Sequence, residues 1–134
     1  MPEIAEVETV RRTLLSKIKG KKIRRVDVLY PKMIECDIDY FKNNLVDKTI
    51  IDIKRIGKWL LFDLDEFYLV SHLRMEGKYF IKDSSEEIVR HEHVIITFTD
   101  NTDLRYHDTR KFGRMNLIKK NELDKYEAIN KQGI

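Results

Sequence analysis

The chain has 134 residues, of which 42% are hydrophobic and 37% charged, a composition typical of one globular domain that excludes a disordered chain. No apolar run approaches the roughly 20 residues that a membrane helix needs, so we expect no membrane-spanning segment. The net charge of +3 is unevenly distributed, because residues 1–25 carry +5, residues 26–104 carry −6 and residues 105–125 carry +4.

Residues 3–19 are predicted to form an amphipathic helix. Apolar side chains recur there at intervals of three and four residues, which places them on one helix face: Ile4, Val7, Val10, Leu14 and Ile18. Pro2 suits the start of the helix and Gly20 suits its end. The N-terminus is therefore expected to be attached to a rigid element.

The period changes after Ile23, where apolar and polar residues alternate as far as Pro31. This pattern predicts a strand over residues 23–30. A short helix is predicted next, with Asp37 as its N-cap and with three inward-facing residues, namely Ile38, Phe41 and Leu45.

From Thr49 to Ile118 short β-type runs alternate with turn signals. Strands are predicted over 49–56, 58–64, 67–73, 77–82, 93–99, 103–108 and 113–119. Such short connections require antiparallel neighbours. With the strand over 23–30 the total is about eight, which predicts a mainly β fold: a two-layer antiparallel β-sandwich with flanking helices. A last helix is predicted from Asn121, carrying Leu123, Tyr126 and Ile129.

Cellular context is indicated by two features. The single cysteine, Cys36, excludes an internal disulfide framework and a cysteine-based zinc cluster. No apolar leader opens the chain, so we expect a cytoplasmic protein.

The two basic segments indicate a possible partner. If folding joins them on one face, that face attracts a polyanion; the alternative is that they form two ordinary solvated faces.

The N-terminus is a candidate catalytic group. Removal of Met1 leaves the secondary amine of Pro2, and an α-amino group has a pKa of about 7.7–8.0, so part of it is nucleophilic at neutral pH. Its condensation with a sugar aldehyde carbon gives a cationic iminium, which favours elimination. Glu3 is a candidate proton donor, with Glu6 one helical turn further on. The alternative is that Pro-Glu only opens a helix.

Several ordered motifs identify a family resemblance. PEIAEVETVRR at the N-terminus resembles the signature opening of the formamidopyrimidine-DNA glycosylase family, which typically reads PELPEVETVRR. Further segments match in order: GKWLLFDL, SHLRMEG, RHEHVIITF and LRYHDTRKFG. The match covers essentially the whole chain. The EVETV motif resembles that of the family branch that removes formamidopyrimidine and 8-oxoguanine from DNA.

The resemblance implies catalytic roles for three residues. Pro2 is expected to attack C1′ of the damaged nucleotide and form a Schiff base, Glu3 to act as general acid–base at the opening sugar, and Lys58 to assist β-elimination and hold a phosphate. The resemblance also implies DNA contacts from His72, His91 and Arg110. The implied partner is damaged double-stranded DNA, the implied pathway is base excision repair, and the protein is expected to be a monomer.

Met75, Arg110 and Phe112 match the three residues that fill the gap left by a flipped-out nucleotide. Extrusion of a base leaves an unstacked hole and an unpaired partner base. An apolar chain and an aromatic ring replace the lost stacking, and a guanidinium hydrogen-bonds the partner. Judged by residue type alone, Met75 is more often a core residue and Phe112 a sheet residue.

A metal site is a further possibility that the histidines raise. His91 and His93 in one strand would share a face beside Glu92, and His107 across a hairpin offers a third ligand. Nothing in the sequence fixes that geometry, and we assign no metal and no cofactor to the chain.

The sequence departs from the family pattern at three positions and in length. Ala5 and Thr109 replace prolines, and Lys111 replaces an arginine, which keeps the charge but not the bidentate geometry. Family members are roughly twice as long, with a helix–two-turn–helix region and a four-cysteine zinc finger in the second half. We therefore expect residues 1–134 to be the N-terminal catalytic domain alone, to contain no zinc, and to have little glycosylase activity.

Three functions remain open at the level of sequence. The first is a DNA glycosylase and abasic-site lyase domain that acts through an N-terminal proline. The second is a DNA-binding module without catalysis on the same scaffold, and the third is a β-sandwich without a nucleic-acid role.

Overall fold

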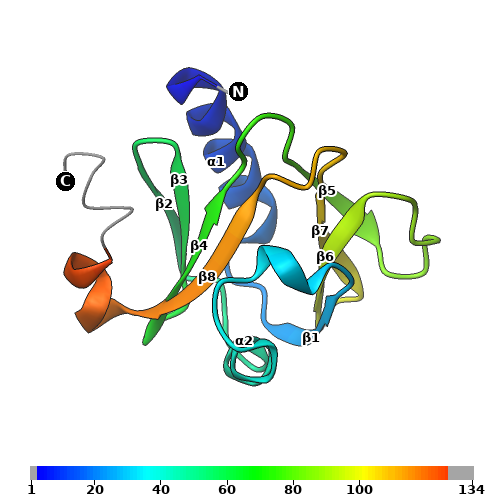
Figure 1. Cartoon of the computed structure of the whole chain (residues 1–134). Coiled ribbons are helices and arrows are strands. Elements are labelled where there is room, and N and C mark those ends of the chain that lie inside the picture. Colours follow the sequence, from blue (N-terminus) through cyan, green and yellow to red (C-terminus); the bar gives the residue numbers. More distant parts are fainter. Residues whose placement is uncertain (1–2, 127–134) are drawn as a thin grey trace.

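Two four-stranded antiparallel sheets contain the strands of residues 3–126, the part of the chain that the computed structural model describes (Figure 1). One sheet has the order β1-β6-β7-β5 and the other β2-β3-β4-β8. This confirms the predicted antiparallel sandwich. The strands are β1 (Ile23–Val28), β2 (Asp52–Ile56), β3 (Trp59–Asp63), β4 (Phe67–His72), β5 (Lys78–Asp83), β6 (Glu92–Phe98), β7 (Thr102–His107) and β8 (Arg114–Lys119).

Helices flank the two sheets: α1 (Ile4–Ile18), α2 (Ile38–Leu45) and the 3₁₀-helices η1 (Pro31–Met33) and η2 (Lys120–Lys125). The end of α1 uses Gly20, whose φ of +86° lets the chain turn while its N–H donates to the Ile50 carbonyl at 2.7 Å. Asp37 caps α2 as predicted, because its side chain accepts a hydrogen bond from the Tyr40 N–H. No helix of residues 3–126 is long and apolar enough to cross a membrane.

The core lies between the two sheets and contains large side chains such as Phe41, Phe62, Phe98 and Tyr106, all of them buried. Burial of each such ring contributes roughly 1.5–3 kcal/mol. Strands β3 and β4 are buried on both faces. Their outer face holds a second apolar cluster of Trp59, Leu61, Tyr68, Val70 and Ile118, against which Leu123 and Tyr126 pack.

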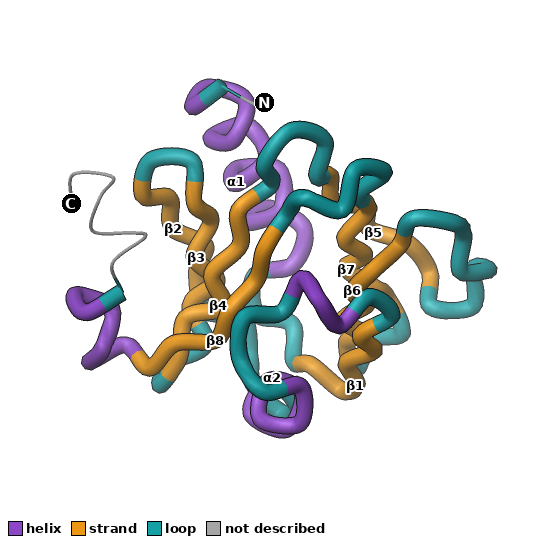
Figure 2. Tube along the Cα trace, in the orientation of Figure 1, coloured by secondary structure: helices purple, strands orange, loops and turns teal. Residues whose placement is uncertain are grey.

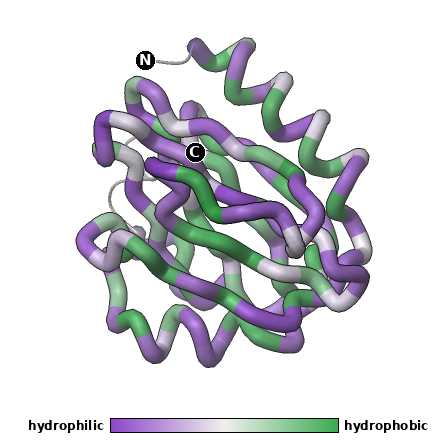
Figure 3. Tube along the Cα trace, turned by 90° about the vertical axis from the view of Figure 1, so that its right-hand side faces the viewer, coloured by the Kyte–Doolittle hydropathy of each residue, from purple (hydrophilic) through white to green (hydrophobic). Residues whose placement is uncertain are grey.

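Two predictions about the helices differ from the structure. Ile4 is 47% exposed rather than buried, because the first turn of α1 projects beyond the strands (Figures 1 and 3). The last helix is the 3₁₀-helix η2, which begins at Lys120 and is not an α-helix capped by Asn121. Three residues per turn place Leu123 and Tyr126 on the same side, where both reach the outer cluster. Ile129 lies outside the described residues.

Three connections gather at one end of the sandwich, beside the start of α1 (Figures 1 and 2). They are the β2–β3 turn (57–58), the β4–β5 loop (73–77) and the β7–β8 loop (108–113), and together we call them the loop end. Strand register explains the gathering, because Trp59 pairs with His72 and His72 pairs with Arg114 in one row across the sheet.

Candidate nucleic-acid interface

The start of α1 brings exposed carboxylates to the loop end. Glu3 precedes the first helical residue and Glu6 lies in the first turn, and both are exposed. Glu6 and Val10 line a cavity of about 320 Å³ together with residues 73 and 75–78 of the β4–β5 segment. Pro2, the predicted nucleophile, lies outside the described residues.

Lys58 and His72 lie at the ends of neighbouring strands. Lys58 is half-exposed in the β2–β3 turn, and His72 is only 7% exposed with its ring 4.9 Å from Trp59. Burial, and then the nearby charges of Arg74 and Lys58, lower the pKa of His72 to about 4. The imidazole is therefore neutral at pH 7.

The tautomer of His72 follows from its hydrogen bond. Its Nδ1 accepts the Arg74 backbone N–H at 2.9 Å, which assigns the proton of the neutral ring to Nε2. A neutral imidazole with this tautomer is a hydrogen-bond donor, as a contact to a phosphate oxygen requires.

The three predicted void-filling residues come together at the loop end. Met75 is 47% exposed and Phe112 is 45% exposed, so neither is a core or sheet residue, although residue type favoured that. Both line a cavity of about 410 Å³ with Arg74 and Arg114. The guanidinium of Arg110 stacks over Phe112, with its Cζ 5.1 Å from the ring centroid.

Asp108 organises the β7–β8 loop and was not singled out from the sequence. Its carboxylate is fully buried and accepts hydrogen bonds from the backbone N–H groups of Arg110, Lys111 and Gly113 at 2.8–3.1 Å. The Tyr106 hydroxyl donates to it as well, at 3.0 Å. The signal that points to Asp108 is an aspartate at the start of a loop, since this side chain commonly accepts bonds from the next N–H groups.

The β4–β5 and β7–β8 loops are also joined to each other. A Cβ at Gly77 or at Gly113 would collide with the Tyr106 hydroxyl, so the close approach of both loops to Tyr106 requires glycine at these positions. Thr109 Oγ1 donates a hydrogen bond to Glu76 Oε2 across the two loops. Thr109 is one of the departures from the family pattern, and a proline at this position has no such donor.

His91 lies beside the same loop, and its carbonyl accepts the Asp108 N–H at 3.0 Å. It precedes β6 with a φ of +73°, so it does not share a strand with His93 as the metal hypothesis assumed. Its ring lies 5.7 Å from that of His107, and burial lowers its pKa. Within residues 3–126 no three His, Cys, Asp or Glu side chains are arranged to hold a metal ion, zinc included.

The positive charge of the loop end comes only in part from the two basic segments of the sequence. The cations there, counting Lys78 and Arg114 at the first residues of β5 and β8, are Lys58, Arg74, Lys78, Arg110, Lys111 and Arg114, half of them from the acidic middle of the sequence. In the first basic segment, Arg11 and Arg12 pair with Glu8, and β1 lies away from the loop end (Figure 1). The two basic segments therefore meet only in part.

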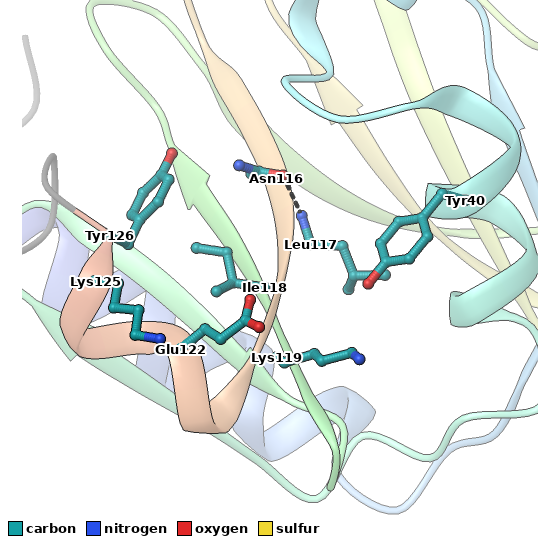
Figure 4. Close-up of a pocket in the computed structure, with 8 residues that line it drawn as sticks. All are labelled: Tyr40, Asn116, Leu117, Ile118, Lys119, Glu122, Lys125 and Tyr126. Atoms are coloured by element: carbon teal, nitrogen blue, oxygen red, sulfur yellow. Dashed lines mark hydrogen bonds between the residues drawn. The ribbon is translucent and has the colours of Figure 1, made fainter.

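Another cavity, of about 270 Å³, lies elsewhere, between α2, β8 and η2 (Figure 4). Tyr40 and Tyr126 flank it, and Lys119, Glu122 and Lys125 line its rim. It contains none of the predicted site residues.

Comparisons with known proteins agree with the geometry. Residues 1–115 match the model of the formamidopyrimidine-DNA glycosylase N-terminal domain. The formamidopyrimidine-DNA glycosylases of Enterococcus faecalis and Lactobacillus helveticus are 49% and 55% identical over 96% and 88% of the chain. These alignments cover 46% and 43% of the two relatives, so the chain spans about half their length.

Solved structures give the same result. A crystal structure of a complex of Lactococcus lactis Fpg with abasic-site DNA is 41% identical, has a TM-score of 0.90, and matches over 95% of this chain and 48% of its own. A complex of that protein with a Fapy-dG-containing DNA also has a TM-score of 0.90, over 94% of this chain.

Proposed function

Because the chain belongs to the formamidopyrimidine-DNA glycosylase family, we propose that it is the N-terminal catalytic domain of a base excision repair enzyme. Its substrate is damaged double-stranded DNA carrying oxidised purines, formamidopyrimidine or 8-oxoguanine. The observation that carries the proposal is the loop end, where Glu6 of α1 lines a cavity with Met75, and where the exposed Met75 and Phe112 line another with Arg74 and Arg114.

The reaction starts at Pro2 once Met1 has been removed. The proline nitrogen attacks C1′, the bond from C1′ to the base breaks, and the base leaves with a proton. The nitrogen then loses its proton and the C1′–O4′ bond breaks as O4′ takes up a proton, which opens the sugar and gives the iminium. The iminium withdraws electrons, so that loss of the C2′ proton and cleavage of the C3′–O bond follow as β-elimination. Glu3 transfers the proton at the opening sugar, and Lys58 assists the elimination and holds a phosphate.

The remaining residues hold the distorted DNA. Met75 and Phe112 occupy the space of the extruded nucleotide, and Arg110 hydrogen-bonds the unpaired partner base. His72 donates its Nε2–H to a backbone phosphate, and His91 contacts the backbone beside the β7–β8 loop. The cations of the loop end strengthen DNA binding through their attraction to the phosphates.

The chain supplies about half of what its relatives contain. We propose that it acts as a monomer in the cytoplasm, bound to the nucleoid when on DNA. We propose that residues 1–134 by themselves excise 8-oxoguanine much more slowly than a full-length relative does.

The test is covalent trapping at an abasic site. Protein whose lack of Met1 has been verified by mass spectrometry is incubated with abasic-site duplex and borohydride, which reduces a Schiff base to a stable adduct. We expect an adduct, and we expect none from the same chain with Met1 retained, because the Pro2 nitrogen is then an amide.

Two outcomes contradict the proposal in different ways. DNA binding without an adduct favours a non-catalytic DNA-binding module on the same scaffold. If the chain neither binds DNA nor forms an adduct, the nucleic-acid role is contradicted altogether. Excision of 8-oxoguanine at the rate of a full-length relative contradicts only the expected weakness of the isolated chain.

A further inference from the structure

Glu8, in the second turn of α1, is bound by three arginines. Arg11 donates to both of its carboxylate oxygens at 2.9 and 2.7 Å, and Arg12 donates to Oε2 at 2.9 Å. The third arginine, Arg55, comes from β2 and donates its Nε–H to Glu8 Oε1 at 3.1 Å. A single carboxylate thus connects the helix to the sheet.

Two of these arginines also bind backbone carbonyls of β2 and of the turn that follows it. Arg11 Nη1 donates to the Ile53 carbonyl at 3.1 Å, and Arg55 Nη1 donates to the Gly57 carbonyl at 2.8 Å. Gly57 is the residue before Lys58 and has a φ of +58°. Arg55 therefore joins α1 directly to the turn that carries Lys58.

This network is only partly shielded from solvent, and it stays charged at neutral pH. The side chains of Glu8 and Arg55 are 23% and 28% exposed. Hydrogen bonds from the arginines, that of Arg11 foremost, lower the pKa of Glu8 to about 2, so the carboxylate is ionised throughout the neutral range. The planar guanidinium of Arg55 donates in two directions at once, which a lysine ammonium at the end of a flexible chain does not reproduce.

We propose that Glu8 and Arg55 are positioning residues that set the place of Lys58 relative to the start of α1, which Pro2 and Glu3 precede in the sequence. The inference rests on the proposed function, because it assigns these residues to the reaction in which Pro2, Glu3 and Lys58 take part. In the structure both side chains bind protein atoms, in α1 and in the β2–β3 turn. They act because a displacement of about 1 Å between reacting groups costs on the order of 100-fold in rate.

The kinetic test compares Arg55→Lys and Glu8→Gln with the unchanged chain, all without Met1. Single-turnover borohydride trapping is measured at saturating abasic-site DNA, and the Kd for the same DNA is measured separately. We expect the trapping rate to fall about 10-fold in both variants while Kd stays within about twofold. The control is Asp27→Asn, which removes the exposed Arg25–Asp27 pair (3.1 Å) on β1 and leaves the rate unchanged.

A second readout does not depend on activity. The NMR order parameters of the Gly57 and Lys58 amides are expected to drop below about 0.6 in the two variants and to stay near 0.85 in the unchanged chain and in Asp27→Asn. Order parameters and trapping rates that equal those of the unchanged chain overturn the inference. If the unchanged chain forms no adduct, the proposed function fails, and the order parameters alone decide whether Glu8 and Arg55 hold the turn.

Discussion

At the scale of single residues, environment decides what each histidine of this chain can do. His72 is buried against Trp59 between two cations, so it is held neutral with its proton on Nε2. His93 is buried too, with its Nε2 2.7 Å from the Asp108 carbonyl oxygen. Their spacing made His91 and His93 metal-ligand candidates in one strand, whereas in the structure His91 lies outside β6 and both histidines bond to the backbone of Asp108, His91 through its carbonyl and His93 through its ring.

Burial of His72 makes stability depend on pH. Its pKa is about 4 in the folded protein against 6.5 for the ordinary side chain, so between these values the unfolded chain binds the extra proton. The contribution of neutral His72 to the free energy of unfolding is complete above pH 6.5. It is lost as the pH falls towards 4, by up to about 3 kcal/mol. Urea unfolding of the chain and of His72→Gln at pH 7.5 and pH 4.5 measures it.

The difference between the two proteins isolates His72, because the other titrating groups are common to both. We expect the free energy of unfolding to fall more steeply with decreasing pH in the unchanged chain than in His72→Gln. Parallel pH profiles contradict a neutral, buried His72.

At the scale of elements, the loop end depends on contacts between loops rather than on regular secondary structure. The Asp108 carboxylate satisfies three backbone N–H groups of its own loop, and the Tyr106 hydroxyl lies against glycines of both loops. Thr109 and Glu76 add a bond between the loops. Hydrogen bonds and packing therefore hold the backbone of the loops that carry the exposed Met75 and Phe112.

The Thr109–Glu76 bond predicts coupled motion of the two loops. In Thr109→Val the hydrogen bond is lost while the side chain keeps its shape, and we expect amide hydrogen exchange to quicken in both the 73–77 and 108–113 loops. Global stability is expected to fall by only about 0.5–1.5 kcal/mol, because both partners are exposed.

Thr102→Val serves as the control for a lost threonine hydroxyl, since Thr102 Oγ1 bonds to Asp100 and Lys21 away from the loop end. Faster exchange confined to the 108–113 loop would show that Thr109 does not couple the loops.

At the scale of the whole molecule, folding adds cations from distant parts of the sequence to the basic β7–β8 loop. The loop end collects Lys58, Arg74 and Lys78 from a stretch of net negative charge and adds Arg110, Lys111 and Arg114. A chain with a net charge of only +3 thereby presents a basic face to a polyanion.

Binding to DNA is therefore expected to depend on salt, but less steeply than in a full-length relative. Each phosphate contact adds about −0.9 to the slope of log K against log salt concentration, and half the length offers fewer contacts. Titrations at 50–200 mM salt against the Enterococcus faecalis relative measure the difference. Lys78→Ala is expected to reduce the slope by about 1.

The matched control is Lys19→Ala, at the opposite end of α1 from Glu3, for which we expect an unchanged slope. An equal effect of both substitutions would mean that the loop end is not the binding face.

Much of the fold could be predicted from the sequence because local patterns dominate it. Alternating residues and short turns predicted antiparallel strands, and the Asp37 cap of α2 was correct. The predicted end of the chain was less accurate, because the 3₁₀-form of η2 depends on the Trp59 cluster that Leu123 and Tyr126 reach.

The sequence by itself determined the sandwich, the amphipathic α1 and the family, since these depend on periodicity and on ordered motifs. Only the tertiary structure decided which residues share the loop end and what supports them. The Glu8–Arg55 bond spans 47 positions, and the Tyr106 hydroxyl lies against Gly77 and Gly113 of two different loops. Such contacts depend on how two sheets and a helix pack in space, and the spacing of residues along the chain does not predict them.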